Sequence, residues 1–290
     1  IRKIVNNYAS ISFNFGATLL SWLENADPAT YRRILDADKI SVNRFGGHGN
    51  AIAQAYNHLI MPLANERDKL SQVRWGIADF VHRFQRKPEG MWLPEAAVDT
   101  ASLEILASEG IRFTILAPRQ AKAYRKIGDP VWTTLHDNID PRRAYICNLP
   151  SGKSIAVFFY DGIVAQEVAF KGLLNHGETF ALRLTGTLGG SNGEVQLAHI
   201  ATDGESYGHH HRFGEMALAA ALDFMEENDL ATLTNYGEFL EKFPPKHEVQ
   251  IHESSSWSCV HGVERWRSDC GCNTGGKPNW NQAWRSPLRE

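Results

Sequence analysis

The stretch Gly90-Met91-Trp92-Leu93-Pro94-Glu95 places an acidic residue directly after a short apolar run. Met91-Trp92-Leu93 is too short for a helix and is typical of a buried strand. Pro94 has no N–H to donate to a sheet, so the strand is expected to end there. A helix is predicted next, over residues 100–109. Glu95 is therefore predicted just past the carboxyl end of a strand, where catalytic residues of parallel β/α folds lie.

A second acidic residue follows a second strand-like run. Residues 195–201 are predicted to form a strand, Asp203-Gly204-Glu205-Ser206-Tyr207-Gly208 follows, and a helix is expected from about Arg212. Glu95 and Asp203 thus lie at the ends of two predicted buried strands and beside aromatic residues. Two carboxylates placed in this way suit glycoside hydrolysis, which in its retaining form needs them about 5 to 5.5 Å apart.

The predicted elements alternate between strands and helices. Further strands are predicted at residues 11–15, 112–116, 144–147 and 155–160, and long helical patterns include residues 64–86. A helix between two short apolar strands indicates a βαβ unit with parallel strands. Three predicted strands end at acidic residues, namely Glu95, Asp161 and Asp203. The alternation therefore predicts an α/β barrel.

The composition is that of an ordinary globular protein and narrows the possible partners. The 290 residues carry a formal net charge of -3, with 43% hydrophobic and 22% charged residues. This charge favours neither nucleic acid nor a membrane surface as a partner. No apolar run approaches the roughly 18 to 20 residues of a spanning helix. The sequence does not indicate an oligomeric state.

Four cysteines are present, at positions 147, 259, 270 and 272. Cys270 and Cys272 are too close in sequence for an easy disulfide with each other. Reduced thiols with a structural or incidental role are the simplest interpretation, and they favour a cytoplasmic protein. Metal binding by Cys259 together with this pair is the alternative, although the spacing matches no standard zinc pattern.

Histidines and aromatic residues supply further candidate functional residues. His48, His58 and Asp203, with the run His209-His210-His211, contain enough ligands for zinc. Consecutive histidines point in different directions, however, so we expect polar loop roles or, for His209, hydrogen bonding to a substrate. Aromatic side chains can stack on sugar rings, although core packing is the alternative for each one. The candidates of this kind are Trp92, Tyr207, Trp257 and Trp266.

These segments together resemble glycoside hydrolase family 57, the family of α-amylases, glucanotransferases and branching enzymes. Trp92-Leu93-Pro94-Glu95 resembles the motif that carries the family's nucleophile, and Asp203-Gly204-Glu205 resembles the motif that carries its acid/base. Phe158-Phe159-Tyr160-Asp161 resembles the start of the family's fourth conserved region, to which the acid/base motif belongs. The second region is matched by Gly47-His48-Gly49-Asn50, Tyr56-Asn57-His58 and Met61-Pro62-Leu63, and the fifth by His261-Gly262 near Trp257.

The resemblance implies roles for individual residues. Glu95 would be the nucleophile and Asp203 the general acid/base. His48, Asp161 and His261 would hold the sugar or orient the carboxylates, and His58 would join them in binding substrate. No cofactor and no catalytic metal are implied, and the implied partner is an α-glucan.

The resemblance also implies a fold, namely an incomplete (β/α)7 barrel followed by the start of a helical domain. Residues 1–230 would form the barrel and residues 231–290 a helical and loop region that contributes to the active-site cleft. The family's first region, with its His-Gln-Pro type motif, is not found. We therefore expect a fragment of a longer protein that lacks the first barrel strand.

Three functions follow as hypotheses. The first is a retaining glycoside hydrolase or glucanotransferase that acts on α-glucans through Glu95 and Asp203. The second is a metal-dependent hydrolase of the polysaccharide deacetylase kind, with His48, His58 and Asp203 as ligands. The third is a non-catalytic glycan-binding relative. Linkage, chain length and the choice between water and a sugar as acceptor are open.

Overall fold

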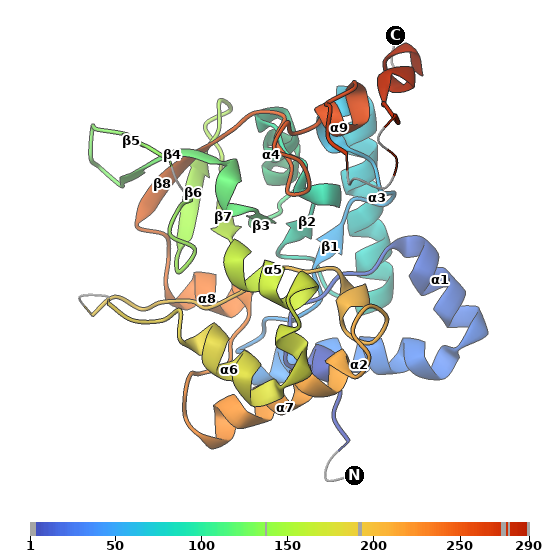
Figure 1. The fold of residues 1–290 in the computed structure, drawn as a ribbon, viewed down its shortest axis with the longest axis vertical. Helices are drawn as coiled ribbons and strands as arrows, with labels where there is room; N and C mark the ends of the chain where they lie inside the picture. The colour runs from blue at the N-terminus through green and yellow to red at the C-terminus, as the bar shows by residue number, and fades with distance from the viewer. Residues whose placement is uncertain (1–3, 137, 191–192, 274–276, 278, 289–290) are drawn as a thin grey trace.

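A computed structural model describes residues 4–136, 138–190, 193–273, 277 and 279–288. The fold mixes helices and strands, as predicted. In Figure 1 the two ends of the chain lie at opposite ends of the molecule. None of the helices in the described ranges is long and apolar enough to cross a membrane.

The segment that contains Glu95 follows a strand that pairs in parallel with its neighbour. Strand β1 (Ala53–Gln54) pairs in parallel with β2 (Met91–Trp92), and β3 (Phe113–Leu116) pairs in parallel with β7 (Ser154–Phe159). A parallel bridge between Gly90 and Phe113 connects the two pairs. The carboxyl ends of these strands therefore lie at the same edge, as parallel pairing requires.

The second part of the sheet is mostly antiparallel. Strands β4 (Ala121–Lys126), β5 (Thr133–Thr134), β6 (Ala144–Asn148) and β8 (His247–Ile251) extend it in the order β3-β7-β6-β8-β4-β5. Strand β8 lies between β6 and β4, so a segment predicted to begin a helical region contributes to this sheet. The strands of the described residues form two sheets, and the incomplete (β/α)7 barrel and the division at residue 230 stay predictions.

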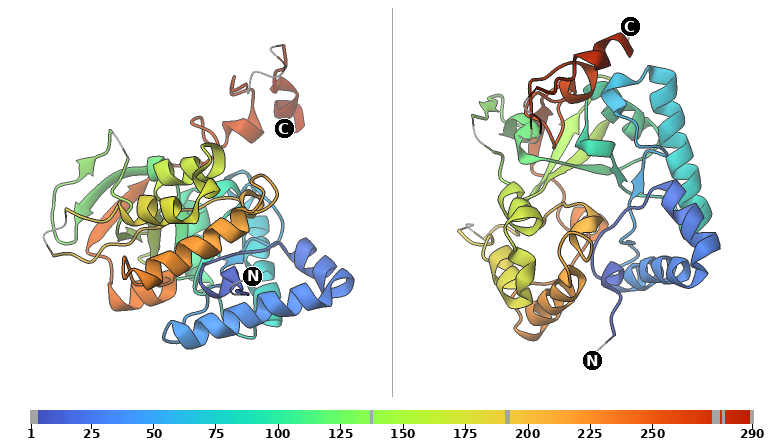
Figure 2. Two further views of the ribbon diagram at one scale, coloured as in Figure 1. Left: turned by 60° about the horizontal axis from the view of Figure 1, so that its bottom comes forward. Right: turned by 45° about the vertical axis from the view of Figure 1, so that its right-hand side comes forward.

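Helices lie on both sides of the strands. Figure 2 shows α1 and α3 on one side of the molecule and α5 and α6 on the opposite side. Helices α2 and α7 lie next to each other and are joined by an ion pair between Arg44 and Glu226. The helices are α1 (Ala17–Ala26), α2 (Pro28–Arg44), α3 (Glu66–Phe84), α4 (Thr100–Ser108), α5 (Gly162–Phe170), α6 (Gly177–Thr185), α7 (Gly214–Glu227), α8 (Tyr236–Lys242) and α9 (Glu264–Arg267). Short 3-10 helices lie at η1 (Asn7–Ala9), η2 (Met61–Leu63), η3 (Pro94–Ala96), η4 (Pro118–Gln120), η5 (Leu173–Asn175), η6 (Gly204–Ser206) and η7 (Ala283–Leu288).

Local sequence signals explain where α4 begins and how closely α3 packs. The Asp99 carboxylate accepts a hydrogen bond from the Ser102 N–H at 2.7 Å, which caps α4. Helix α3 approaches β1 at Gly76, where an added Cβ would lie 2.0 Å from the Gln54 carbonyl oxygen. Glycine is therefore required at position 76 for helix and strand to pack at this distance.

The predictions for helices 64–86 and 100–109 and for strands 112–116, 144–147 and 155–160 are confirmed to within a few residues. The strand predicted at residues 195–201 is wrong. That segment is hydrogen-bonded only at separate points, from the Leu197 N–H to the Arg142 carbonyl and from the Asp161 N–H to the His199 carbonyl, so no continuous ladder forms. Of residues 11–15, only Phe13 makes a bridge, to Ala51.

Candidate active site

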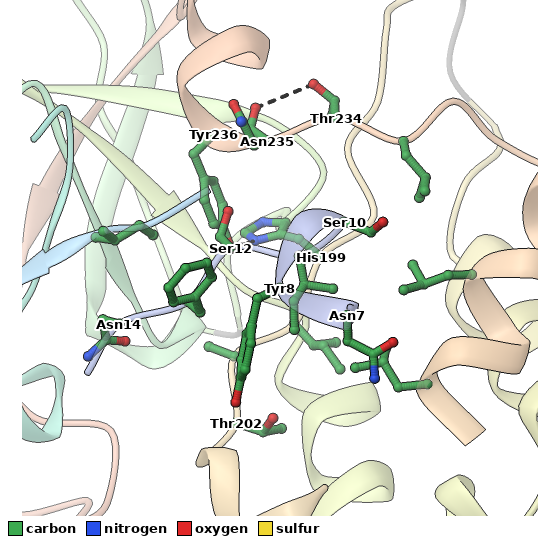
Figure 3. A pocket seen from close by; sticks show the side chains of 18 of the residues that line it. Asn7, Tyr8, Ser10, Ser12, Asn14, His199, Thr202, Thr234, Asn235 and Tyr236 are labelled. Atoms are coloured by element: carbon green, nitrogen blue, oxygen red, sulfur yellow. Dashed lines mark hydrogen bonds between the residues drawn. The ribbon is translucent and has the colours of Figure 1, made fainter. Parts of the chain in front are cut away.

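The two predicted catalytic carboxylates come from segments that meet at one cavity. Glu95 lies on η3, immediately after β2, and Asp203 directly precedes η6. The cavity measures about 1320 Å³, and Asp203, His58 and Trp92 are among the residues that line it. Figure 3 shows that part of its lining comes from the amino-terminal segment, including Tyr8, and from His199 and Tyr236. A cavity of this size accommodates a ligand larger than a single sugar ring.

The backbone at Glu95 adopts a conformation that is uncommon for a residue with a side chain. Glu95 has φ 58° and ψ 18°, and the next residue, Ala96, has φ 46°. Left-handed backbone of this kind costs about 1 kcal/mol or more for a non-glycine residue. The turn is fixed by the hydrogen bonds from the Ala96 N–H to the Leu93 carbonyl and from the Trp257 N–H to the Glu95 carbonyl. The chain therefore leaves the extended conformation of β2 at Glu95.

The Glu95 carboxylate is held at both oxygens. Its Oε1 lies 3.5 Å from His58 Nε2, and its Oε2 accepts a hydrogen bond of 3.1 Å from the indole N–H of Trp257. The hydrogen bond with His58 is the largest influence on Glu95, and with those from Ser258 and Trp257 it lowers the pKa of this carboxyl to about 2. The same pair raises the pKa of His58. Glu95 is therefore ionised and fixed in orientation at neutral pH.

Asp203 is perturbed in the opposite direction. Partial desolvation is the largest cause that raises the pKa of Asp203, followed by the negative charges of Glu205 and Glu95. The charges of His210 and His58 act against this rise. Asp203 lines the cavity and is close enough to Glu95 for the two charges to interact. Two such carboxyl groups, one with a lowered and one with a raised pKa, divide naturally into a base or nucleophile and an acid.

Aromatic rings surround the Glu95 side of the cavity. The rings of Trp92 and Trp257 meet edge to face with centroids 4.9 Å apart, and Tyr160 contacts Trp257 at 6.2 Å. Trp92 and Trp257 both line the cavity. Flat apolar faces in such a position can stack on sugar rings, as expected for these two tryptophans.

Tyr207 and His209 lie on the segment that follows Asp203. Tyr207 lines the cavity, where its hydroxyl accepts a 3.1 Å hydrogen bond from Thr202. His209 is exposed, and its backbone N–H donates to the Glu205 carbonyl. The structure thus directs Tyr207, and not His209, to the cavity lining.

Three other predicted site residues make contacts elsewhere. His48 is buried between the carboxylates of Glu89, at 2.9 Å, and Glu241, at 3.1 Å. The Asp161 carboxylate accepts hydrogen bonds from the Ile163 and Val164 backbone N–H groups and so caps α5. His261 lies beside the thiols of Cys259 and Cys272. Trp266, the remaining aromatic candidate, packs with Val263 and Ile60.

The cavity lining and the loop beside it include residues that the sequence did not single out. His199 is buried, its Nδ1 lies 3.0 Å from the Tyr236 hydroxyl, and its Nε2 lies 3.0 Å from the Pro141 carbonyl oxygen. Burial lowers the pKa of His199 to about 4, so the ring is neutral at pH 7. Arg119 donates to the carbonyls of Ser256 and Trp257 and thereby holds the loop that reaches Glu95. A histidine within an apolar run was the one available signal for His199.

Potential metal ligands gather at a different place from the carboxylates. Within the described part of the chain, one group of at least three His, Cys, Asp or Glu side chains could hold a metal ion. It consists of Cys259, His261, Cys270 and Cys272. His48, His58 and Asp203 do not form such a group among those residues. The arrangement needed for the metal-dependent hydrolase is therefore missing from the described site.

Sequence comparison relates this chain to known proteins. Residues 45–252 match the model of glycosyl hydrolase family 57. The chain is 26% identical to α-amylase 1 of Dictyoglomus thermophilum over 106 residues, which is 37% of this chain and 15% of the amylase.

Solved structures show the same fold. An exo-type maltose-forming amylase from Pyrococcus sp. ST04 superposes with a TM-score of 0.76 at 18% identity, over 98% of this chain and 49% of that one. A 4-α-glucanotransferase from Thermococcus litoralis gives 0.68 at 19% identity, over 91% and 38%. The chain thus spans about half the length of the first of these enzymes. Because the family model covers most of the chain, this protein belongs to glycosyl hydrolase family 57.

Proposed function

We propose that this protein cleaves α-glucosidic bonds of an oligo- or polysaccharide with retention of configuration at the anomeric carbon. The observation that carries the proposal is the opposite perturbation of two interacting carboxyl groups, Glu95 and Asp203, beside an aromatic-lined cavity. The pKa of Glu95 is lowered to about 2 and that of Asp203 is raised. Family membership and the amylase and glucanotransferase neighbours support an α-glucan as the substrate.

The first half of the reaction uses Glu95 as nucleophile. One carboxylate oxygen of Glu95 forms a bond to the anomeric carbon while the bond to the leaving oxygen breaks, and Asp203 gives its proton to that oxygen. His58 and Trp257 hold the two Glu95 oxygens, so the attacking group is positioned before the sugar arrives. The product is a glycosyl ester on Glu95 and an ionised Asp203.

The second half of the reaction releases the sugar. Asp203 takes a proton from water or from the hydroxyl of a second sugar, whose oxygen attacks the anomeric carbon and displaces Glu95. Water as acceptor gives hydrolysis, and a sugar gives transfer. Trp92, Trp257 and Tyr207 would stack on or contact the sugar rings in the cavity. We further propose that the parallel strands belong to the incomplete (β/α)7 barrel that the resemblance implies.

The test is product analysis after incubation with maltoheptaose. The protein should give shorter maltooligosaccharides, and longer ones as well if it transfers. Glu95→Gln and Asp203→Asn should each lower the rate by at least about 10³-fold, because each removes one half of the mechanism. Glu227→Gln is the matched control, since Glu227 is exposed on α7. A folded protein that binds maltoheptaose without turnover, or normal turnover in Glu95→Gln, would contradict the proposal.

A further inference from the structure

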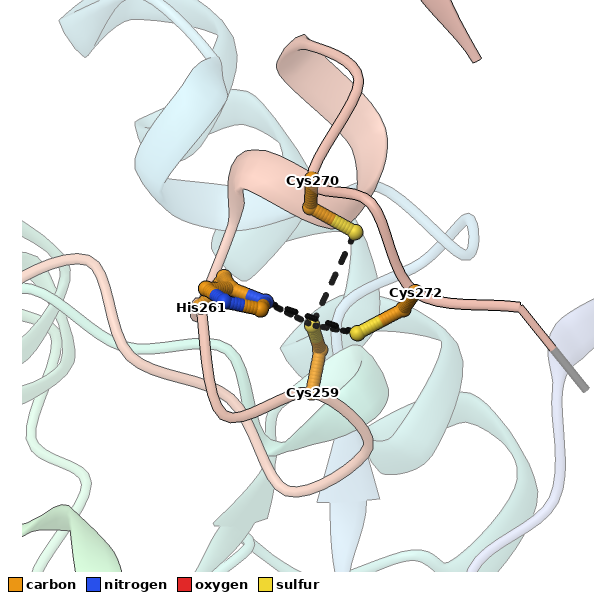
Figure 4. A group of neighbouring side chains, drawn as sticks. All are labelled: Cys259, His261, Cys270 and Cys272. Atoms are coloured by element: carbon orange, nitrogen blue, oxygen red, sulfur yellow. Dashed lines mark hydrogen bonds between the residues drawn. The ribbon is translucent and has the colours of Figure 1, made fainter. Parts of the chain in front are cut away.

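Four metal-ligating side chains converge in the carboxyl-terminal tail, outside the cavity. The Sγ atom of Cys259 lies 3.8 Å from that of Cys272 and 4.0 Å from that of Cys270. The Nδ1 atom of His261 lies 3.8 Å from the Cys259 sulfur and 3.4 Å from the Cys272 sulfur. All four atoms are within 4.8 Å of one another, and Figure 4 shows the side chains pointing toward a common centre.

These separations are those of ligands around a tetrahedral zinc ion. Two sulfurs that are each about 2.3 Å from tetrahedral zinc are about 3.8 Å apart, and a sulfur and a nitrogen are about 3.5 Å apart. The same sulfurs are much too distant for a disulfide bond, which measures about 2.05 Å. We propose that Cys259, His261, Cys270 and Cys272 bind one Zn²⁺ ion.

The donor set makes this a structural site. Three thiolates and one imidazole nitrogen are soft ligands that select zinc over calcium or magnesium. They also fill the tetrahedral shell, so no position is left for a reactive water. The ligands come as two pairs, each separated by one residue. Gly271, between the second two, has φ 74°, a left-handed conformation that favours glycine and lets both cysteines face the first pair.

The metal would tie down a tail that has little apolar packing of its own. Helix α9, which lies between the two ligand pairs, contains no buried residue. Val263 is the buried residue that fixes the neighbouring turn, against Ile60 and Ala97. A bound Zn²⁺ would therefore replace part of the hydrophobic core that this segment does not have.

The metal site lies close in sequence to Trp257, a residue that contacts Glu95. Trp257, whose indole and backbone N–H groups both donate to Glu95, directly precedes Ser258 and Cys259. On the far side, Gly262 packs so closely that an added Cβ would lie 2.2 Å from the Ser254 carbonyl oxygen. Zinc would thus hold the loop at residues 254–258 against Glu95. This consequence for catalysis rests on the proposed function, whereas metal binding itself does not.

Metal analysis of the purified protein is the first experiment. We expect about one zinc ion per chain by elemental mass spectrometry. Cys259→Ser and Cys272→Ser should each lose most of it, whereas Cys147→Ala, a change at the buried cysteine of β6, should retain it. His261→Asn and His252→Asn form a second matched pair, in which only the first should weaken binding. Less than about a tenth of an ion per chain, iron in place of zinc, or full zinc in Cys259→Ser would overturn the proposal.

A second experiment keeps the test decisive if the cysteine variants fail to fold. The wild-type protein is stripped with a chelator and loaded with Co²⁺ as a probe. Cobalt bound by three thiolates and an imidazole should show thiolate charge-transfer absorption and the intense visible bands of tetrahedral cobalt. Added Zn²⁺ should abolish them. Weak octahedral bands, or a disulfide between two of the three cysteines found by mass spectrometry, would contradict the site.

The effects of zinc removal on stability can be measured separately from its effects on catalysis. Zinc removal should lower the Tm by about 5 °C and increase proteolysis between residues 254 and 272, and added Zn²⁺ should reverse both effects. An unchanged Tm together with unchanged proteolysis after complete removal would contradict a structural role. These measurements need no substrate. A bound zinc ion in a protein that does not cleave maltoheptaose would therefore refute the proposed function and leave the metal site standing.

Discussion

Replacement of His58 by alanine tests whether the ionised state of Glu95 is built into the site. His58 Nε2 lies 3.5 Å from Glu95 Oε1 and is the largest single influence on the pKa of Glu95. Alanine removes both the hydrogen bond and the positive charge, whereas the contacts of Glu95 with Trp257 and Ser258 remain. The pKa of Glu95 should therefore rise toward its ordinary value of 4.5 without reaching it.

The size of this pKa change follows from the depressed pKa of Glu95 and from the exposure of the two side chains to water. A change from 4.5 to about 2 corresponds to about 3.4 kcal/mol in favour of the ionised form. The side chain of His58 is 70% exposed and that of Glu95 27%, so water screens the pair. We therefore expect the loss of His58 to remove about 1 kcal/mol of the free energy that favours ionised Glu95, which raises the pKa of Glu95 by about 1.

The assay is the pH dependence of kcat/KM on a maltooligosaccharide, together with thermal unfolding. The acid limb should move up by about one pH unit in His58→Ala. Because the folded-state pKa lies below 4.5, ionised Glu95 stabilises the fold above pH 4.5, and this contribution is lost as the pH falls toward about 2. The variant should therefore also have a Tm lower by about 2 °C at pH 7. An acid limb that does not move in a folded variant, or an equal shift in the control His252→Ala, would refute the reasoning.

Three further predictions concern Asp203, its neighbour and the packing of α3. Glu205→Gln removes a negative charge that raises the pKa of Asp203, so the alkaline limb of kcat/KM should move to lower pH; an unmoved limb would show that Glu205 does not act on Asp203. Asp203→Asn should lose far more activity on natural substrates than on aryl glycosides, whose good leaving groups need no protonation, whereas Glu95→Gln should lose activity on both. Initial rates on the two substrates measure this, and equal losses in the two variants would argue against an acid role of Asp203. Gly76→Ala should destabilise the fold by about 1 to 3 kcal/mol in denaturant unfolding, since its Cβ would lie 2.0 Å from the Gln54 carbonyl oxygen, and an unchanged midpoint would show that α3 can move away from β1.

Local patterns were sufficient to predict the elements on either side of Glu95, but not the segment before Asp203, which forms no strand. Pro94 ends β2, and Asp99 caps α4, so the position of Glu95 between them follows from adjacent residues. The approach of His58 and Trp257 to Glu95 was not predicted, because both residues were expected to bind substrate and no spacing rule brings them to Glu95. The chain separates Trp257 from Glu95 by 162 residues, and only the folded loop brings them together.

Other contacts depend on long-range packing that the sequence does not display. His48 is enclosed by Glu89 and by Glu241, which is 193 residues away on α8, so its partners could not be predicted from the Gly-rich motif around it. Strand β8 was missed because its position depends on pairing with β4 and β6 rather than on a strong apolar alternation. Residues 195–201 have the apolar character of a strand, yet their neighbours offer only separate hydrogen bonds.

The left-handed backbone at Glu95 has a consequence for the evolution of this protein. Glycine and asparagine adopt that conformation at less cost than glutamate, so under the proposed function selection for catalysis would hold an unfavourable residue type at position 95. The ion pair with His58 offsets part of this cost, and a substitution at either residue removes that compensation. Gene copies released from selection for catalysis should therefore drift first at position 95, toward glycine or asparagine, and His58 should follow. In such a lineage, the order of these two losses would date the end of the proposed activity.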